Sequence, residues 1–95
     1  MSKVIWTQNA LDDLAGIQEY IARDSIYYAE KFVDDAFSAV ERLEVFPESG
    51  RMVPERYDPD FREVIFGSYR IIYKIIGGDV YIVTMIHGMR NYQPE

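Results

Sequence analysis

The sequence predicts an α+β domain of order β-α-α-β-β-β, with a helical hairpin packed on one face of an antiparallel sheet. Two observations support this prediction. Two segments in the first half repeat apolar residues about every 3.6 positions, which is the period of an amphipathic helix. Three later segments rich in Ile, Val, Phe and Tyr are separated by Gly67-Ser68 and Gly77-Gly78, which favour two-residue hairpin turns.

Length and composition fit one domain, residues 1–95, without a cofactor. Of the 95 residues, 48% are hydrophobic, with eight Tyr and five Phe to fill a small core. The chain has no cysteine and one histidine, His87, so thiolate metal sites are excluded and a zinc site is not expected. No signal peptide and no run of about 20 apolar residues are visible, so we expect a cytoplasmic protein without a membrane partner.

The charge balance is acidic. Ten Lys and Arg against sixteen Asp and Glu give a formal net charge of −6. Contacts to phosphates need a cationic surface, so the net charge argues against direct nucleic-acid binding. The sequence also has no Gly-rich phosphate loop, no paired metal ligands and no nucleophile elbow.

The chain begins with a predicted strand and helix. Residues 3–6 contain Val, Ile and Trp, which suit a buried strand. Thr7 or Asn9 then caps a helix that runs to about Arg23. Its apolar stripe consists of Ala10, Leu11, Leu14, Ile17 and Ile21.

A second helix is predicted over residues 26–46. Asp24-Ser25 breaks the first helix and caps the second, and Pro47 stops it. Because the link is short, the two helices should form an antiparallel hairpin. The apolar stripe of the second helix consists of Ala29, Phe32, Val33, Ala36, Val40 and Leu43.

The second half is predicted to be a loop followed by three strands. Residues 48–60 are rich in Pro, Gly and charge, which is typical of a loop, with a short extended piece at 51–54. The strands are expected at residues 61–66, 69–76 and 80–87.

Two-residue turns would fix the strand register. Phe66 would then face Tyr69 and Ile75 would face Val80. The core face would contain Val64, Phe66, Tyr69, Ile71, Tyr73, Ile75, Val80, Ile82 and Ile86. The far face, turned away from the helices, would contain Phe61, Glu63, Ile65, Arg70, Ile72, Lys74, Tyr81, Val83, Met85 and His87. If Gly77-Gly78-Asp79 made a three-residue turn, the last strand would slip.

The predicted far face mixes large apolar side chains with a few charges, which is typical of a docking site. The alternative is that the loop at 48–60 and the C-terminal tail fold over it. The docking interpretation predicts that a partner binds Phe61, Ile65, Arg70, Ile72, Tyr81, Met85 and His87.

Arg70 lies mid-strand on this face and has two interpretations. It could hold a phosphate or a partner carboxylate, or it could pair with Glu63 diagonally across the hairpin. Acid–base chemistry on RNA would need a group near the end of the last strand, formed by Glu55, His87, Arg90 and Tyr92.

A series of motifs resembles the ParE/RelE family of toxins from type II toxin–antitoxin systems. The first half contributes Trp6-Thr7, Asp13-Leu14, Ile17 and Tyr20-Ile21-Ala22. The second half contributes Phe46-Pro47-Glu48-Ser49-Gly50-Arg51, Val53-Pro54-Glu55, Phe61-Arg62-Glu63, Tyr69-Arg70-Ile71-Ile72-Tyr73 and His87-Gly88 with Arg90. The resemblance covers nearly the whole chain.

The resemblance implies a sheet in which the first strand pairs beside the last, and a cognate antitoxin that folds onto the toxin. The ParE branch poisons DNA gyrase, whereas the RelE branch cuts mRNA in the ribosomal A site. In RelE-like enzymes an Arg of the Tyr-Arg strand motif, a C-terminal Arg and a C-terminal Tyr serve catalysis. The matching candidates are Arg70, Arg90 and Tyr92.

Two departures favour the ParE branch. Residues 53–66 contain only Arg56 and Arg62 as cations, so the lysines expected of a RelE-like nuclease are missing. A net charge of −6 also opposes an approach to ribosomal RNA. Three hypotheses remain: a gyrase-binding toxin, a ribosome-dependent endoribonuclease, and an inactive relative that retains only antitoxin binding.

Overall fold

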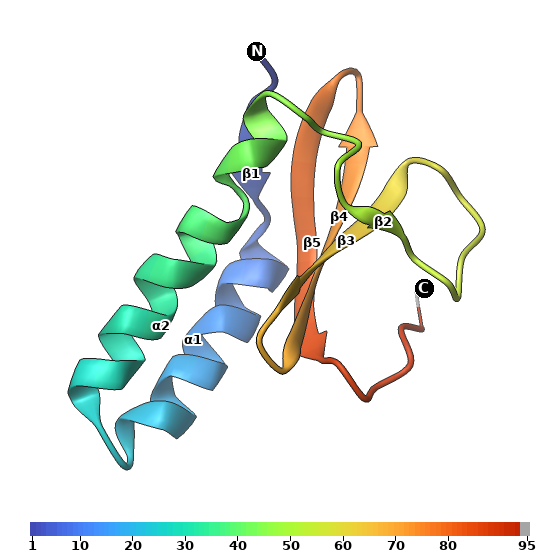
Figure 1. Cartoon of the computed structure of the whole chain (residues 1–95). Helices are drawn as coiled ribbons and strands as arrows, with labels where there is room; N and C mark the ends of the chain where they lie inside the picture. Colours follow the sequence, from blue (N-terminus) through green and yellow to red (C-terminus); the bar gives the residue numbers. More distant parts are fainter. Residues whose placement is uncertain (94–95) are drawn as a thin grey trace.

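Two helices lie across one face of a five-stranded sheet, which gives the two-layer arrangement of Figure 1. The structure is a computed structural model, and it describes residues 1–93. In chain order its elements are β1 (Val4–Trp6), α1 (Gln8–Ala22), α2 (Ile26–Ala39), the 3-10 helix η1 (Glu41–Glu44), β2 (Arg51–Met52), β3 (Phe61–Phe66), β4 (Tyr69–Ile76) and β5 (Asp79–His87). In the part of the chain that the structure describes, no helix has the length and apolarity needed to cross a membrane. The predicted order is confirmed, and the extended piece after the helices forms β2.

The strands lie in the order β1-β5-β4-β3-β2. The predicted two-residue turns at Gly67-Ser68 and Gly77-Gly78 are confirmed, and they make β3, β4 and β5 an antiparallel meander. β1 pairs with β5 in parallel, with Val4 opposite Val80. The first strand thus pairs beside the last, as the family resemblance implies, and its parallel direction makes the sheet mixed at this edge. The helical hairpin and the meander return the chain to the end of the sheet where β1 begins, so β5 runs alongside it in the same direction.

Both helices begin where their capping residues predict. The hydroxyl of Thr7 accepts a hydrogen bond from the backbone N–H of Ala10 at 3.2 Å, so Thr7 and not Asn9 caps α1. Ser25 caps α2 in the same way through the N–H of Tyr28. The second helix does not continue to residue 46 as one α-helix. It ends at Ala39, and the tighter turn of η1 follows, which keeps Leu43 fully buried against the sheet.

The main core lies between the helices and the sheet. Its members are apolar and come from α1, α2, η1, β3, β4 and β5, and the two helical stripes and the strand alternation predict all of them except Met85. The buried residues are Ala10, Leu14, Ala36, Val40, Leu43, Val64, Ile71, Tyr73, Val80, Ile82 and Met85.

A bulge in β5 interrupts the strand alternation. Tyr73 of β4 pairs with Ile82, but its neighbour Ile72 pairs with Thr84, so Val83 is an extra residue in β5. Successive side chains point to opposite faces of a sheet, and one inserted residue reverses every later position. The two-residue turns are therefore correct, and the predicted sorting fails only beyond the bulge.

The reversal corrects the predicted places of three residues. Met85 lies in the core on the helix side, where it is 3% exposed, and Ile86 packs on the far face instead. The side chain of His87 points to the same side of the sheet as that of Met85, where it lies beside Tyr69, and not to the far face. The carboxylate of Asp13 on α1 holds the bulge, because its Oδ2 accepts hydrogen bonds from the hydroxyl of Thr84 and from the N–H of Met85 at 3.1 Å.

Candidate functional site

Arg70 of β4 is buried on the far face, where its side chain is 4% exposed. Its Nε donates to Glu63 Oε1 at 2.7 Å. Nη1 and Nη2 donate to the two carboxylate oxygens of Glu55 at 2.8 and 2.7 Å, which makes a bidentate pair. Nη1 also donates to the backbone carbonyl of Arg90 at 2.8 Å. A neighbouring strand, the loop after β2 and the C-terminal tail thus converge on one guanidinium.

The charges around Arg70 alternate in sign. Glu63 on β3 is fully buried, and its second oxygen accepts a hydrogen bond from Nε of Arg51, which lies opposite it on β2. Glu55 accepts a further hydrogen bond from the backbone N–H of Tyr92 at 2.9 Å. The two arginines and two glutamates sum to zero charge. This balance lets the strands bury a carboxylate and a guanidinium that would each be very costly alone.

These contacts make Glu55 a weak base and leave Arg70 few free hydrogen-bond donors. The hydrogen bond from Arg70 is the main cause that lowers the pKa of Glu55 to about 2, and the same bond raises the pKa of Arg70. A carboxylate with so low a pKa is a weak base near neutral pH. The N–H groups of Arg70 already have acceptors, so few donors remain for a phosphate. The predicted ion pair between Arg70 and Glu63 is present.

An apolar cluster closes the rest of the far face. Val53, Phe61 and Ile72 are buried together, and the ring of Tyr92 lies 6.4 Å from that of Phe61. Two further side chains from β5 pack against this cluster, Val83 and Ile86. The expectation of an open docking face is therefore wrong at Phe61, Arg70 and Ile72. The loop after β2 and the C-terminal tail cover them, which was the alternative interpretation.

Four of the seven predicted partner-binding residues are thus inside the protein, since Met85 lies in the main core as well. The other three remain accessible. Ile65 is 55% exposed, Tyr81 is half-buried and His87 is exposed. Partner binding by Ile65, Tyr81 and His87 stays a prediction.

The side chains of Arg70, Arg90 and Tyr92 do not line a common pocket. The tail contacts Arg70 through the backbone of Arg90, while the side chains of Arg90 and Tyr92 line a pocket that Arg70 does not reach. Burial raises the pKa of the Tyr92 phenol, opposed by the charge of Arg56. His87 lies against the ring of Tyr69, and its Nδ1 accepts a hydrogen bond from the N–H of Met89.

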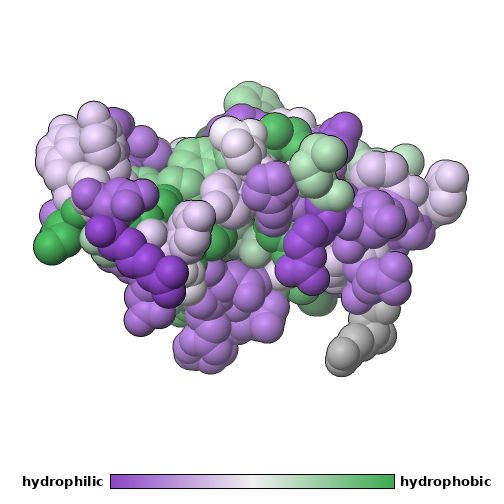
Figure 2. Space-filling model, turned by 90° about the horizontal axis from the view of Figure 1, so that it is seen from below, coloured by the Kyte–Doolittle hydropathy of each residue, from purple (hydrophilic) through white to green (hydrophobic). Residues whose placement is uncertain are grey.

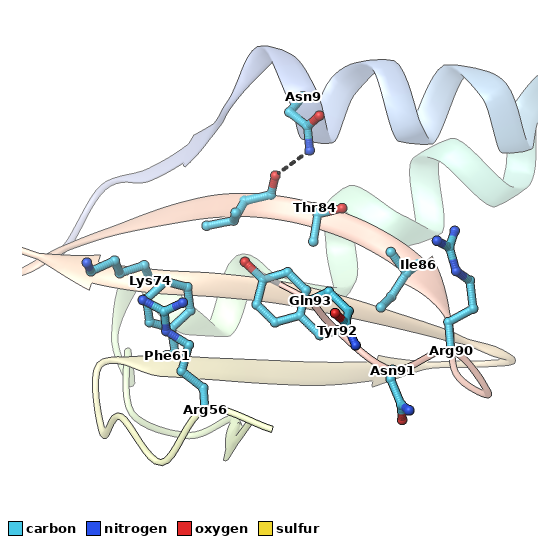
Figure 3. Close-up of a pocket in the computed structure, with 11 residues that line it drawn as sticks. Asn9, Arg56, Phe61, Lys74, Thr84, Ile86, Arg90, Asn91, Tyr92 and Gln93 are labelled. Carbon is cyan, nitrogen blue, oxygen red and sulfur yellow. Dashed lines mark hydrogen bonds between the residues drawn. The ribbon is translucent and has the colours of Figure 1, made fainter. Parts of the chain in front are cut away.

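The pocket beside the tail has a volume of about 640 Å³ (Figure 3). In Figure 3, Lys74 and Arg56 lie at one end, Arg90 lies at the other, and the ring of Tyr92 lies between them. Other lining side chains carry amides, namely Asn9, Asn91 and Gln93. Within residues 1–93, no group of three or more His, Asp or Glu side chains is arranged to hold a metal ion.

Large apolar side chains are also exposed at the tip of the helical hairpin. Tyr20 lies on α1, and Ile26, Tyr27 and Tyr28 lie on the first turn of α2. Figure 2 views the molecule from this end and shows hydrophobic residues in small patches between hydrophilic ones. The exposed apolar surface is therefore dispersed at this end of the molecule.

Sequence reasoning missed the residues that fix the far face. Glu55 belongs to the Val53-Pro54-Glu55 motif, but its spacing gives no sign that it would hold Arg70. Asp13 looks like an ordinary residue near a helix start, yet it holds the β5 bulge. Both contacts join segments far apart in the sequence, so no local pattern reports them.

Comparisons with known proteins give a matching family model, a similar toxin and a solved structure of the same fold. A family model described as "ParE toxin of type II toxin-antitoxin system, parDE" matches residues 4–92. The Toxin RelE2 of Caulobacter vibrioides is 34% identical over 91 residues, covering 95% of this chain and 99% of that protein. A solved structure described as "Chromosomal ParDE TA system from P. aeruginosa" has the same fold, with a TM-score of 0.76 at 22% identity, and the match covers 92% of this chain and 96% of the other. The chain belongs to the ParE toxin family of type II toxin–antitoxin systems.

Proposed function

We propose that this chain is a toxin that binds and inhibits DNA gyrase, without chemistry of its own, and that a cognate antitoxin neutralises it. The observation that carries the proposal is the state of Arg70. Its hydrogen bonds go to Glu55, Glu63 and the tail backbone, so the arginine that would serve catalysis in a RelE-like nuclease already has acceptors for its N–H groups. Membership of the ParE family supports gyrase as the target.

Charge also argues against cleavage of ribosome-bound mRNA. The chain carries a net charge of −6, so long-range repulsion would oppose an approach to ribosomal RNA. General acid–base catalysis is most efficient when the catalytic pKa lies near the working pH. Glu55, with a pKa of about 2, is far from that condition.

A ribosome-dependent endoribonuclease is the second candidate. It is favoured by the relative named Toxin RelE2 and by the side chains of Arg90 and Tyr92 at one pocket. Such an enzyme would have to release Arg70 from Glu55 and Glu63 before it could act. This cost makes the nuclease the weaker proposal.

Induced expression in bacterial cells separates the candidates. Gyrase poisoning should produce filaments and DNA damage, whereas mRNA cleavage should stop translation at once. With purified protein, we expect inhibition of gyrase supercoiling and no cleavage of mRNA on ribosomes. The proposal would be rejected if the protein cleaved mRNA on ribosomes and left the supercoiling activity of gyrase unchanged. A protein that binds antitoxin but neither inhibits gyrase nor cleaves mRNA would be an inactive relative.

We also infer that burial of apolar surface, rather than charge, drives binding of the antitoxin, as a helix in a groove or as an added strand. The inference is supported by the acidic net charge of the chain and by exposed apolar side chains such as Ile65 and Ile26. The antitoxin should be encoded in a small neighbouring reading frame. The dissociation constant of the complex should change little with salt concentration, whereas a steep rise would contradict an apolar interface.

A further inference from the structure

The pocket beside the C-terminal tail gathers positive charge in an acidic protein. Its lining includes Arg56, Lys74 and Arg90, and none of its lining residues within the described chain is Asp or Glu. Across residues 1–93, none of these three cations lies within salt-bridge distance of a carboxylate. The side chains that line the pocket therefore carry a net positive charge, opposite in sign to the net charge of the molecule.

Phe61 brings two of these cations together. The guanidinium carbon of Arg56 lies 4.1 Å from the centre of the Phe61 ring, and Nζ of Lys74 lies 5.0 Å from the same centre. Cation–π attraction favours each position separately, but the two like charges repel one another. An anion bound between Arg56 and Lys74 would relieve this repulsion.

The remaining lining suits a flat, polar ring. Tyr92 presents an aromatic surface between the two charged ends of the pocket (Figure 3). The side-chain amides of Asn91 and Gln93 supply both donors and acceptors. A volume of about 640 Å³ is within the usual range for small-molecule sites and exceeds what one carboxylate side chain would fill.

We propose that this pocket binds a nucleotide, with its phosphates at Arg56 and Lys74 and its base stacked on Tyr92. The site is independent of the gyrase proposal, because it is defined by the lining of the pocket and not by a surface for another protein. The same chemistry fits a free nucleoside diphosphate or one nucleotide of a single strand. An acidic peptide would need the cations but neither Tyr92 nor the amides, so the lining favours a nucleotide.

Calorimetry and backbone NMR titration of the purified full chain test the proposal with defined probes. ADP should bind and shift the amide signals of residues near Tyr92, inorganic pyrophosphate should bind more weakly, and adenosine more weakly still. A short oligothymidylate distinguishes a strand from a free nucleotide: tighter binding than ADP assigns the site to a strand, and weaker binding assigns it to a free nucleotide. Equal binding of adenosine and ADP, or tighter binding of an oligoglutamate peptide, would overturn the proposal.

Variants with matched controls complete the test. Lys74→Gln should weaken ADP binding by about tenfold or more, the usual effect of losing one charged hydrogen bond. Lys31→Gln removes the same charge from the outer face of α2, where Lys31 pairs with Asp35, and should leave ADP affinity unchanged. Tyr92→Leu should weaken ADP binding but not pyrophosphate binding. Equal losses of ADP affinity in Lys74→Gln and Lys31→Gln would show nonspecific electrostatic attraction and reject the site. Thermal unfolding of both variants at the same temperature as the original protein excludes misfolding.

Discussion

The two faces of the sheet are closed by different physical means. On the helix side, apolar residues such as Ile71 and Ile82 are fully buried among side chains from both helices. On the far face, a smaller apolar cluster stands beside an alternating series of charges in which Arg70 has two carboxylate partners. Apolar packing accepts many partners of similar volume, whereas a buried charge needs a specific partner at hydrogen-bond distance.

The contrast predicts where single substitutions are least tolerated. Arg70→Ala should lower the free energy of unfolding by about 3–5 kcal/mol, because it leaves Glu63 buried without its main partner. Ile82→Val on the helix side removes one methyl group and should lower it by only about 0.5–1.5 kcal/mol. Urea unfolding of both variants measures the difference. A loss in Arg70→Ala no larger than that in Ile82→Val would show that the charges of the far face are dispensable.

A triple variant makes the same comparison when Arg70→Ala does not fold. Glu55→Gln, Glu63→Leu and Arg70→Met together remove the buried charges, and the one ion that loses its partner, Arg51, has a side chain that is 59% exposed to solvent. Replacing a whole buried ion network by apolar groups is often neutral, whereas removing one member is costly. We therefore expect the triple variant to be more stable than Arg70→Ala. The reverse order in urea unfolding would show that the network itself stabilises the fold.

Acid should weaken the far face before the helix-side core. The folded-state pKa of Glu55 is about 2, below its ordinary value of 4.5, so the folded protein binds fewer protons than the unfolded chain. The contribution of Glu55 is fully present above pH 4.5 and is lost as the pH falls toward 2. Over this pH range, Glu55 should change the free energy of unfolding by less than the full value of about 1.4 kcal/mol per pH unit for one proton, because solvent screens a side chain that is 23% exposed. Urea unfolding at several pH values should show a shallower dependence in Glu55→Gln, and equal slopes would contradict the pairing.

The β5 bulge is the next most sensitive point, and it belongs to the interface between helix and sheet. Asp13→Ala removes the acceptor for the hydroxyl of Thr84 and the N–H of Met85, which should cost about 1–3 kcal/mol. Asp12→Ala is the matched control, because Asp12 is exposed and bonds only to Gln8 of its own helix among the described residues. Faster hydrogen exchange at Met85 in Asp13→Ala alone is the expected result. Similar exchange in both variants would mean that β5 keeps its bulge without Asp13.

The helix side could be predicted from sequence because its signals are local. Thr7 and Ser25 cap their helices, and Gly67-Ser68 and Gly77-Gly78 set the hairpin turns as expected. Each signal acts within a few residues of its position. The bulge at Val83 gives no such signal, and it reverses the orientation of every later residue of β5.

The far face could be predicted only in part. Strand register places Glu63 beside Arg70, and their ion pair was one of two interpretations. The ion pair between Glu55 and Arg70, and the packing of Val53 over Phe61 and Ile72, depend on how a loop folds back over the sheet. Loop paths follow tertiary packing and not periodicity, so an apolar strand face alone does not show whether it is open.

The smallest effect on stability is expected at the exposed edge of the far face, where the prediction of partner binding remains. Ile65 is 55% exposed, so Ile65→Ser should change the free energy of unfolding by less than about 0.5 kcal/mol. Ile76, on the same sheet and 50% exposed, is the matched control because it was not expected to bind a partner. If antitoxin binds this edge, Ile65→Ser should weaken the complex while Ile76→Ser should not. Equal affinities of both variants for antitoxin would show that antitoxin does not bind at Ile65.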